Sequence, residues 1–257
     1  MSASAERADA ARRLVIEAAI SAGTCHIGSS LSIIDVLAVL YEDVLPKGPP
    51  HRFLLSKGHA ASGLWATLAA FGQIDPGDFV RGYCSDDGLF AGHPERGVAG
   101  VEMTGGSLGH GPAIAVGTAL ADRHDGNGRR TFCLVGDGEL NEGSVWEAIA
   151  LAGHHRLSNL TLIVDANGLQ GLGTTAEVLD LEPLRPKLSA FRFDVAEVHG
   201  HDHDALREAF RAPAELPRAV IARTVKGNGV SFMENELMWH YRTLKEGDRE
   251  RVMAELS

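Results

Sequence analysis

Two short polar motifs, each preceded by an apolar run, constrain the fold of this chain more than any other feature. Gly136-Asp137-Gly138 follows the apolar run 131–135, and Asp165-Ala166-Asn167 follows the apolar run 160–164. Each run has the length and the branched side chains of a buried strand, and the segment 143–156 between the motifs has the apolar spacing of a helix. A strand-helix-strand unit makes the two strands parallel, so Asp137 and Asn167 are predicted to emerge at the same edge of one sheet.

The residues at this edge suit a hard cation and a phosphate. The carboxylate of Asp137 and the amide oxygen of Asn167 are ligands that Mg²⁺ accepts, with phosphate oxygens and water completing its octahedron. Gly136 and Gly138 let the backbone approach a phosphate closely. Asp-Gly after a strand is also an ordinary turn, but two such motifs joined by one helix favour a site for a metal-bound diphosphate.

The rest of the chain continues the alternation of helices and strands. Helices are predicted at 7–22, 32–41, 59–71, 112–123, 203–211 and 243–256, and further strands at 53–55, 193–198 and 218–224. Segment 75–92 is predicted to be loop with one short helix, and 169–191 mostly irregular with a short helix at 179–188. This alternation predicts an α/β fold, a doubly wound, mainly parallel sheet with helices on both faces. Because no linker or repeat interrupts it, we expect one domain over 1–257.

Composition excludes several classes of partner. The net charge of −10 disfavours nucleic acid as a ligand. Three widely spaced cysteines, Cys25, Cys84 and Cys133, have no metal-ligand spacing and favour a reducing compartment. Cys133 lies within an apolar run and is predicted to be core. No apolar run reaches the length of a membrane span, and the acidic residues among 1–20 argue against a signal peptide. We therefore expect a cytoplasmic protein with neither a membrane nor a nucleic-acid partner.

Longer motifs around these residues resemble the transketolase family. The interval from Asp137 to Asn167 resembles the thiamine diphosphate signature, and segment 136–147 (GDGELNEGSVWE) resembles transketolases in particular. Further matching motifs occur in the same order: 25–28 (CHIG), 55–60 (LSKGHA), 92–95 (GHPE), 105–111 (GGSLGHG), 226–230 (KGNGV) and 239–240 (WH). The resemblance covers almost the whole chain and implies the diphosphate-binding domain of the thiamine diphosphate-binding fold.

The resemblance implies a role for each matching residue. Mg²⁺, or Ca²⁺ or Mn²⁺ in its place, would be bound by Asp137, Asn167 and the main-chain oxygen of Leu169. Thiamine diphosphate would be contacted by Lys57, His59, Gly106, Leu108, Asp137, Gly138, Asn167, Lys226 and His240. His26 and His240 would assist proton transfer at a substrate oxygen, and His93 would bind hydroxyls of a donor ketose. Histidine suits both tasks near neutral pH.

Glu142 and Glu147 match family carboxylates near the subunit interface. Their alternative role is to complement the dipole at the N-terminus of the helix predicted over 143–156.

The implied activity is transfer of a two-carbon ketol unit from a ketose or ketose phosphate to an aldehyde acceptor. A transketolase of full length continues into a pyrimidine-binding domain, which carries the glutamate that activates the cofactor, and into a third domain. This chain stops at residue 257. The resemblance therefore predicts the N-terminal subunit of a split transketolase, active only with a separate C-terminal subunit in an α₂β₂ assembly.

Two departures from the family pattern bear on the substrate pocket. Tyr241 stands where the family usually has glycine, and Trp65 where a smaller aromatic residue is common; Tyr241 could narrow the donor pocket. Alternatives therefore remain open: another thiamine diphosphate reaction, with a 2-keto acid donor or a non-sugar acceptor in a specialised pathway, or a non-catalytic subunit that retains the fold.

Overall fold

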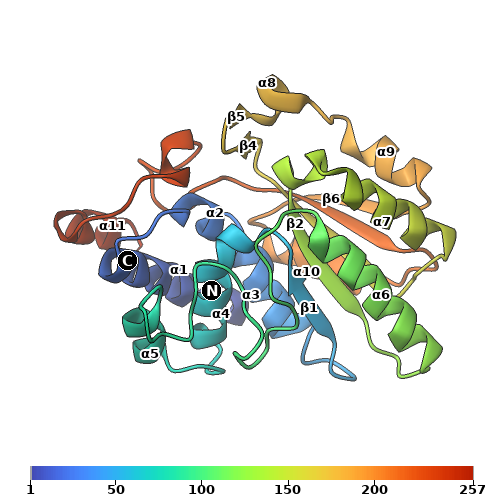
Figure 1. Ribbon diagram of the computed structural model, residues 1–257, viewed down its shortest axis with the longest axis horizontal. Coiled ribbons are helices and arrows are strands. Elements are labelled where there is room, and N and C mark those ends of the chain that lie inside the picture. The colour runs from blue at the N-terminus through green and yellow to red at the C-terminus, as the bar shows by residue number, and fades with distance from the viewer. Residues whose placement is uncertain (1, 257) are drawn as a thin grey trace.

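Five parallel strands form the centre of the computed structural model, in which residues 2–256 are described (Figure 1). Their order across the sheet is β1 (Arg52–Leu55), β2 (Thr131–Gly136), β3 (Leu160–Ala166), β7 (Arg218–Arg223) and β6 (Asp194–His199). Asp165 lies in register with Gly136 on one side and with Ala222 on the other. The carboxyl ends of the three central strands therefore finish at the same edge, as the sequence predicts for β2 and β3.

Alternate side chains of the buried strands enter two separate hydrophobic cores. Phe132 and Leu134 point into the first core, whereas Cys133 and Val135 point into the second. The first core is covered by α1 (Ala3–Ala22), α3 (Ile34–Asp43), α4 (Ala61–Ala70) and α10 (His203–Arg211), and the second by α6 (His110–His124), α7 (Gly143–His154) and α9 (Leu184–Ala190). Helices on both faces confirm the predicted doubly wound α/β fold, and the full burial of Cys133 confirms its place in the core.

The chain leaves neighbouring strands toward opposite faces of the sheet. After β1, the 3₁₀ turn η1 (Gly58–Ala60) leads into α4 on the first face, and after β2, η2 (Gly138–Asn141) leads into α7 on the second face. Such a divergence opens a crevice at the carboxyl ends of the strands, which is where ligands bind in open α/β sheets.

Several elements differ from the sequence prediction. The short helix α2 (Ile27–Leu31) precedes α3, so the helix predicted at 32–41 begins only at Ile34. The stretch predicted as irregular after residue 168 holds the hairpin β4 (Leu169–Gln170) and β5 (Gly173–Thr174), followed by α8 (Thr175–Leu179). A capping box between Thr174 and Glu177 starts α8, a local signal that the prediction overlooked. The helix predicted at 179–188 is misplaced, because α9 starts at Leu184, directly after Pro183.

The helices outside these layers support the first face. In the loop-rich region after α4, α5 (Pro76–Gly82) is the predicted short helix, and its N-cap is Asp75. The C-terminal helix α11 (Arg249–Glu255) is shorter than predicted, since the 3₁₀ turns η3 (Leu237–His240) and η4 (Glu246–Asp248) precede it. It lies against α1, so the two ends of the described chain are close together (Figure 1). Within residues 2–256, no helix is long and apolar enough to cross a bilayer.

Candidate functional site

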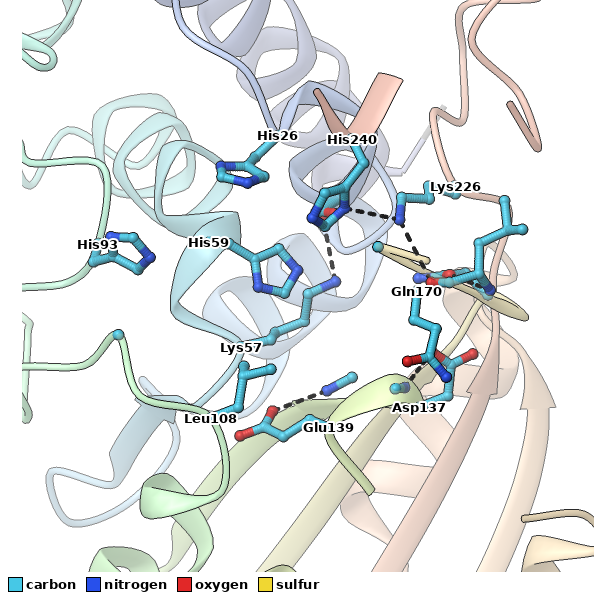
Figure 2. A pocket seen from close by; sticks show the side chains of 17 residues that line it. His26, Lys57, His59, His93, Leu108, Asp137, Glu139, Gln170, Lys226 and His240 are labelled. Carbon is cyan, nitrogen blue, oxygen red and sulfur yellow. Dashed lines mark hydrogen bonds between the residues drawn. The ribbon is translucent and has the colours of Figure 1, made fainter. Parts of the chain in front are cut away.

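A cavity of 330 Å³ opens at the carboxyl edge of the sheet. All the residues predicted to contact cofactor, metal or substrate line it: His26, Lys57, His59, His93, Gly106, Leu108, Asp137, Gly138, Asn167, Leu169, Lys226 and His240. Figure 2 shows histidines from separate segments facing one part of this space, with Asp137 and Gln170 at another. Residues that are up to 214 positions apart in the chain (240 − 26 = 214) thus share one site.

Asp137 links the ends of β2 and β3. Its carboxylate accepts hydrogen bonds from the amides of Gly138, at 2.8 Å, and Gly168, at 2.6 Å. Asn167 is oriented in turn, because its Oδ1 accepts from the amide of Leu169 at 3.0 Å and its Nδ2 donates to Asp165 at 2.9 Å. Burial and the neighbouring charge of Asp165 raise the pKa of Asp137 to about 6. A cation at this carboxylate would stabilise its ionised form.

Lys57 and Asp165 form a buried ion pair beneath the cavity. Lys57 is 1% exposed, and its ammonium group pairs with Asp165 and donates to the carbonyl of Ser29 at 3.2 Å. Asp165 also accepts hydrogen bonds from the hydroxyls of Ser32 and Thr224. Burial by itself would raise the pKa of Asp165, but Lys57 and these hydrogen bonds lower it. The charge of Lys57 is therefore already directed at a protein carboxylate, a pairing that the sequence motifs did not predict.

Lys226 connects the metal-binding candidates with the histidines. Its Nζ lies 3.4 Å from the carbonyl oxygen of Leu169 and 3.2 Å from Nδ1 of His240. Burial, together with the positive charge of Lys57, lowers the pKa of Lys226 to about 8. An ammonium group donates to both neighbours, so Nδ1 of His240 acts as the acceptor and the ring proton of His240 lies on Nε2.

Three histidines form a cluster along one side of the cavity (Figure 2). The ring centroid of His26 lies 5.6 Å from that of His59 and 4.8 Å from that of His240, and the centroids of His59 and His240 are 5.4 Å apart. The backbone of His26 has φ = 66°, a left-handed conformation that is uncommon for a residue with a side chain. Its amide donates to the carbonyl of His240 at 3.2 Å, which helps to hold that conformation.

The environment keeps these imidazoles neutral. Burial lowers the pKa of His240 to about 3 and that of His59 well below 6.5, with the nearby lysines adding to both effects. The pKa of His26 is also lowered, mainly by burial and then by the charges of His93 and Lys226. Neutral imidazoles at neutral pH can accept a proton or hydrogen-bond a hydroxyl. His93 differs from the cluster because it is exposed and lies on the loop that borders the cavity.

Glycines allow the loops to approach the cavity. Gly106 has φ = 152°, a conformation that L side chains rarely adopt, and it lies against the ring of His93. A Cβ at Gly138 would lie 2.7 Å from Cβ of Gln170, so the turn after Asp137 has no room for a side chain. Gly106, Leu108 and Gly138 therefore bring backbone close to any ligand of the cavity.

The structure adds residues that were not predicted to contact a ligand. Ser29, Glu139, Gln170 and Gly171 line the cavity as well. Glu139 is 2% exposed, and its carboxylate accepts hydrogen bonds from the hydroxyl of Ser56 and from the amides of Gly109, at 2.8 Å, and Gly136, at 3.2 Å. It thereby joins the end of β1, the 105–111 turn and the end of β2. Its place two residues after Asp137, within the same motif, was an available signal.

Replacing Glu139 by alanine is expected to lower the free energy of unfolding by about 2–3 kcal/mol, because buried amides and a hydroxyl lose their acceptor. Urea denaturation measures the loss. Glu139→Gln keeps one acceptor oxygen and is expected to lose less. Equal losses in the two variants would show that the hydrogen bonds to Gly109 and Gly136 contribute little.

Four residues discussed from the sequence lie outside the cavity. Glu142 and Glu147 are exposed, and neither complements the start of α7 through a side-chain hydrogen bond: Glu142 is an N-cap without one, and Glu147 lies beyond the first turn. Trp65 is fully buried in the first core, and its Nε1 donates to the carbonyl of Ala91. Tyr241 is 52% exposed and does not line the cavity; its hydroxyl donates to the carbonyl of Gly171, at 2.7 Å.

Among the described residues, no group of three His, Cys, Asp or Glu side chains could hold a metal ion by itself. The candidate ligands are instead one carboxylate, one amide oxygen and one carbonyl oxygen, which fits Mg²⁺ completed by phosphate oxygens and water. A fold that brings these oxygens, two lysines and neutral imidazoles to the carboxyl edge of a parallel sheet has the features of a thiamine diphosphate-binding domain.

Comparison with known proteins agrees with this class. Residues 3–256 match the family model described as transketolase, thiamine diphosphate binding domain. The chain is 39% identical to one of the separately encoded subunits of the apulose-4-phosphate transketolase of Actinobacillus succinogenes, with 95% of this chain and 92% of that protein covered. It is 36% identical to the SqwG subunit of the 6-deoxy-6-sulfo-D-fructose transketolase of a Clostridium species, with 97% and 94% covered.

Transketolases of full length match over the same region. The human enzyme is 35% identical, with 96% of this chain but 41% of the enzyme covered. The solved structure of transketolase from Leishmania mexicana superposes with a TM-score of 0.91 at 30% identity, and the chain spans all of its own length but 41% of that enzyme. The chain therefore belongs to the transketolase family, as a thiamine diphosphate-dependent transferase component with the extent of the separately encoded subunits. The predicted family, fold and cofactor are confirmed.

Proposed function

We propose that this chain works together with a separate C-terminal subunit to transfer a two-carbon ketol unit from a ketose to an aldehyde. The observation that supports this most strongly is the convergence of every predicted ligand-contacting residue on one cavity. A protein that only retained the fold would have no need of a buried carboxylate, an oriented amide and neutral histidines around the same space. We take residues 1–257 as a single domain with this role.

The cavity residues divide between the two ends of the cofactor. Asp137, Asn167 and the carbonyl of Leu169 would hold Mg²⁺, or Ca²⁺ or Mn²⁺, and with Gly138 and Lys226 would secure the diphosphate. Lys57 would act through Asp165, keeping the floor of this end charge-balanced. When bound, thiamine diphosphate supplies a nucleophilic carbon and an electron sink for cleavage of a carbon–carbon bond.

The histidines would handle protons and hydroxyls of the substrate. His240 presents a protonated Nε2, because its Nδ1 faces Lys226, and it can therefore donate a hydrogen bond to a substrate oxygen. His26, neutral and 4.8 Å away by ring centroids, can accept the proton released when a hydroxyl becomes a carbonyl. His59 would pack against the cofactor, and the exposed His93 would bind donor hydroxyls.

The relatives indicate the class of donor. Apulose 4-phosphate and 6-deoxy-6-sulfo-D-fructose, named in two relatives, are ketoses that carry an anionic group. We infer that this enzyme also acts on a ketose with a terminal anion. The partner subunit would provide the activating glutamate and the rest of the acceptor pocket. We further propose an α₂β₂ assembly in the cytoplasm, with Glu142 and Glu147 at an interface between its subunits.

Reconstitution tests the proposal. The chain is co-expressed with the C-terminal transketolase subunit encoded beside it and assayed with thiamine diphosphate, Mg²⁺ and an aldose phosphate acceptor. Donors are xylulose 5-phosphate, apulose 4-phosphate and 6-deoxy-6-sulfo-D-fructose, and mass spectrometry follows an acceptor longer by two carbons. We expect transfer from at least one ketose, and none when either of the two subunits is left out.

Other results would select other functions. Product formation from pyruvate with release of CO₂, and none from a ketose, would indicate a 2-keto acid donor. A complex that binds no thiamine diphosphate would indicate a non-catalytic role for this chain. Activity of this chain alone would contradict the split-enzyme proposal.

A further inference from the structure

A buried carboxylate outside the cavity organises a separate polar network. Asp35 on α3 is 4% exposed and receives hydrogen bonds from Arg12, His201, His203 and Asn228. We call these five residues the Asp35 network. Its members come from α1, α3, the β6–α10 turn and the loop after β7, and none of them lines the cavity described above.

His201 has a defined orientation in this network. The amide of Val225 donates to Nε2 of His201 at 2.8 Å, so that nitrogen is an acceptor without a proton. The ring proton therefore lies on Nδ1, which donates to Asp35 at 2.6 Å. His203 is bound to the same carboxylate through Nε2, at 2.9 Å, but its Nδ1 faces the hydroxyl of Ser4 on α1, at 2.8 Å. Only His201 of the two connects Asp35 to the loop after β7.

The network holds that loop on both sides of Lys226. His201 binds the amide of Val225, and Asp35 accepts from Nδ2 of Asn228 at 3.3 Å. Between these anchors, Gly227 has φ = 84° and its amide donates to the carbonyl of Gly28, at 3.0 Å. A peptide fixed at residues 225, 227 and 228 leaves Lys226 with little freedom to point elsewhere.

We propose that His201 and Asp35 are positioning residues, which fix loop 225–229 and thereby aim Lys226 at the diphosphate end of the cavity. The 1% exposure of Lys226, and its contacts with Leu169 and His240, depend on that backbone position. The role of Lys226 toward thiamine diphosphate rests on the proposed function. The fixing of the loop itself does not.

A matched pair of variants separates positioning from a purely structural role. His201→Ala and His203→Ala each remove one imidazole from Asp35, and the two side chains are similarly buried, at 11% and 13% exposed. Only His201→Ala also removes the acceptor of Val225. His201→Gln places an amide oxygen near the position of Nε2 and serves as the rescue variant.

Two readouts are taken on the complex with the partner subunit. Amide hydrogen exchange of the peptide that spans 225–229 reports order in the loop, and calorimetry at saturating Mg²⁺ reports the affinity for thiamine diphosphate. We expect His201→Ala to speed exchange and to weaken affinity about tenfold, His203→Ala to leave both near wild type, and His201→Gln to restore most of both.

Equal exchange in the two alanine variants would overturn the proposal, because any loss from the Asp35 network would then loosen the loop alike. Faster exchange in His201→Ala with unchanged affinity would also overturn it, since the loop would not aim Lys226 at the cofactor. If the wild-type complex binds no thiamine diphosphate, the proposed function fails, whereas the exchange comparison still decides whether His201 fixes the loop.

Discussion

Replacing Asp137 by alanine is expected to weaken binding of thiamine diphosphate to the reconstituted complex at least 100-fold, about 2.8 kcal/mol. Asp137 is the only carboxylate in the proposed ligand set, so its loss leaves the cation with two neutral protein oxygens. The same change frees the amides of Gly138 and Gly168, which hold the ends of β2 and β3 together. Isothermal titration calorimetry with Mg²⁺ present measures the affinity.

Two controls isolate the role of the charge. Asp137→Asn keeps an acceptor for the neighbouring amides but removes the negative charge, and we expect most of the affinity loss to remain. Asp125→Asn removes an exposed carboxylate at the C-terminus of α6 and should leave binding unchanged. An Asp137→Ala complex with wild-type affinity would show that the metal assignment is wrong.

Replacing Lys57 by methionine is expected to lower the free energy of unfolding by about 3–5 kcal/mol. The reason is that Asp165 is fully buried, and without Lys57 its negative charge has no opposite charge beside it. The remaining donors, Ser32 and Thr224, are neutral hydroxyls. Urea denaturation of the purified chain, followed by circular dichroism, measures the change.

The double variant Lys57→Met, Asp165→Asn tests that explanation. It carries no buried charge at this point, so we expect it to recover much of the lost stability. For comparison, Arg81→Met breaks an exposed ion pair with Asp78 and should cost at most about 1 kcal/mol. If the double variant is less stable than Lys57→Met alone, the loss does not come from the unpaired charge of Asp165.

The secondary structure that was predicted well is local in origin. The unit β2–α7–β3 follows directly from apolar runs and helical spacing, and the structure places its strands within two residues of the prediction. Helix α2 was missed because it follows His26, whose left-handed backbone is set by tertiary contacts with the 237–240 turn. The hairpin after Asn167 was missed because strands of two residues carry no periodicity to detect.

The site divides in the same way. Residues that belong to contiguous motifs, such as Asp137, Asn167 and His59, were found from the sequence and all line the cavity. Gln170 and Ser29 were not, because their side chains reach the cavity only through the folding of loops that carry no motif. His201 seemed a histidine of merely local importance, since its carboxylate partner Asp35 lies 166 residues away in the chain.

The amino-acid sequence by itself determined the parallel strands, the edge at which they end and the polar groups that emerge there, because each depends on short-range spacing and on the fixed geometry of strand-helix-strand units. Only the tertiary structure decided how those groups are paired and charged. Burial makes the histidines neutral, Asp165 takes the charge of Lys57, and the Asp35 network anchors the loop that carries Lys226. Burial and long-range hydrogen bonds depend on the whole packed chain, so no local pattern in the sequence could specify them.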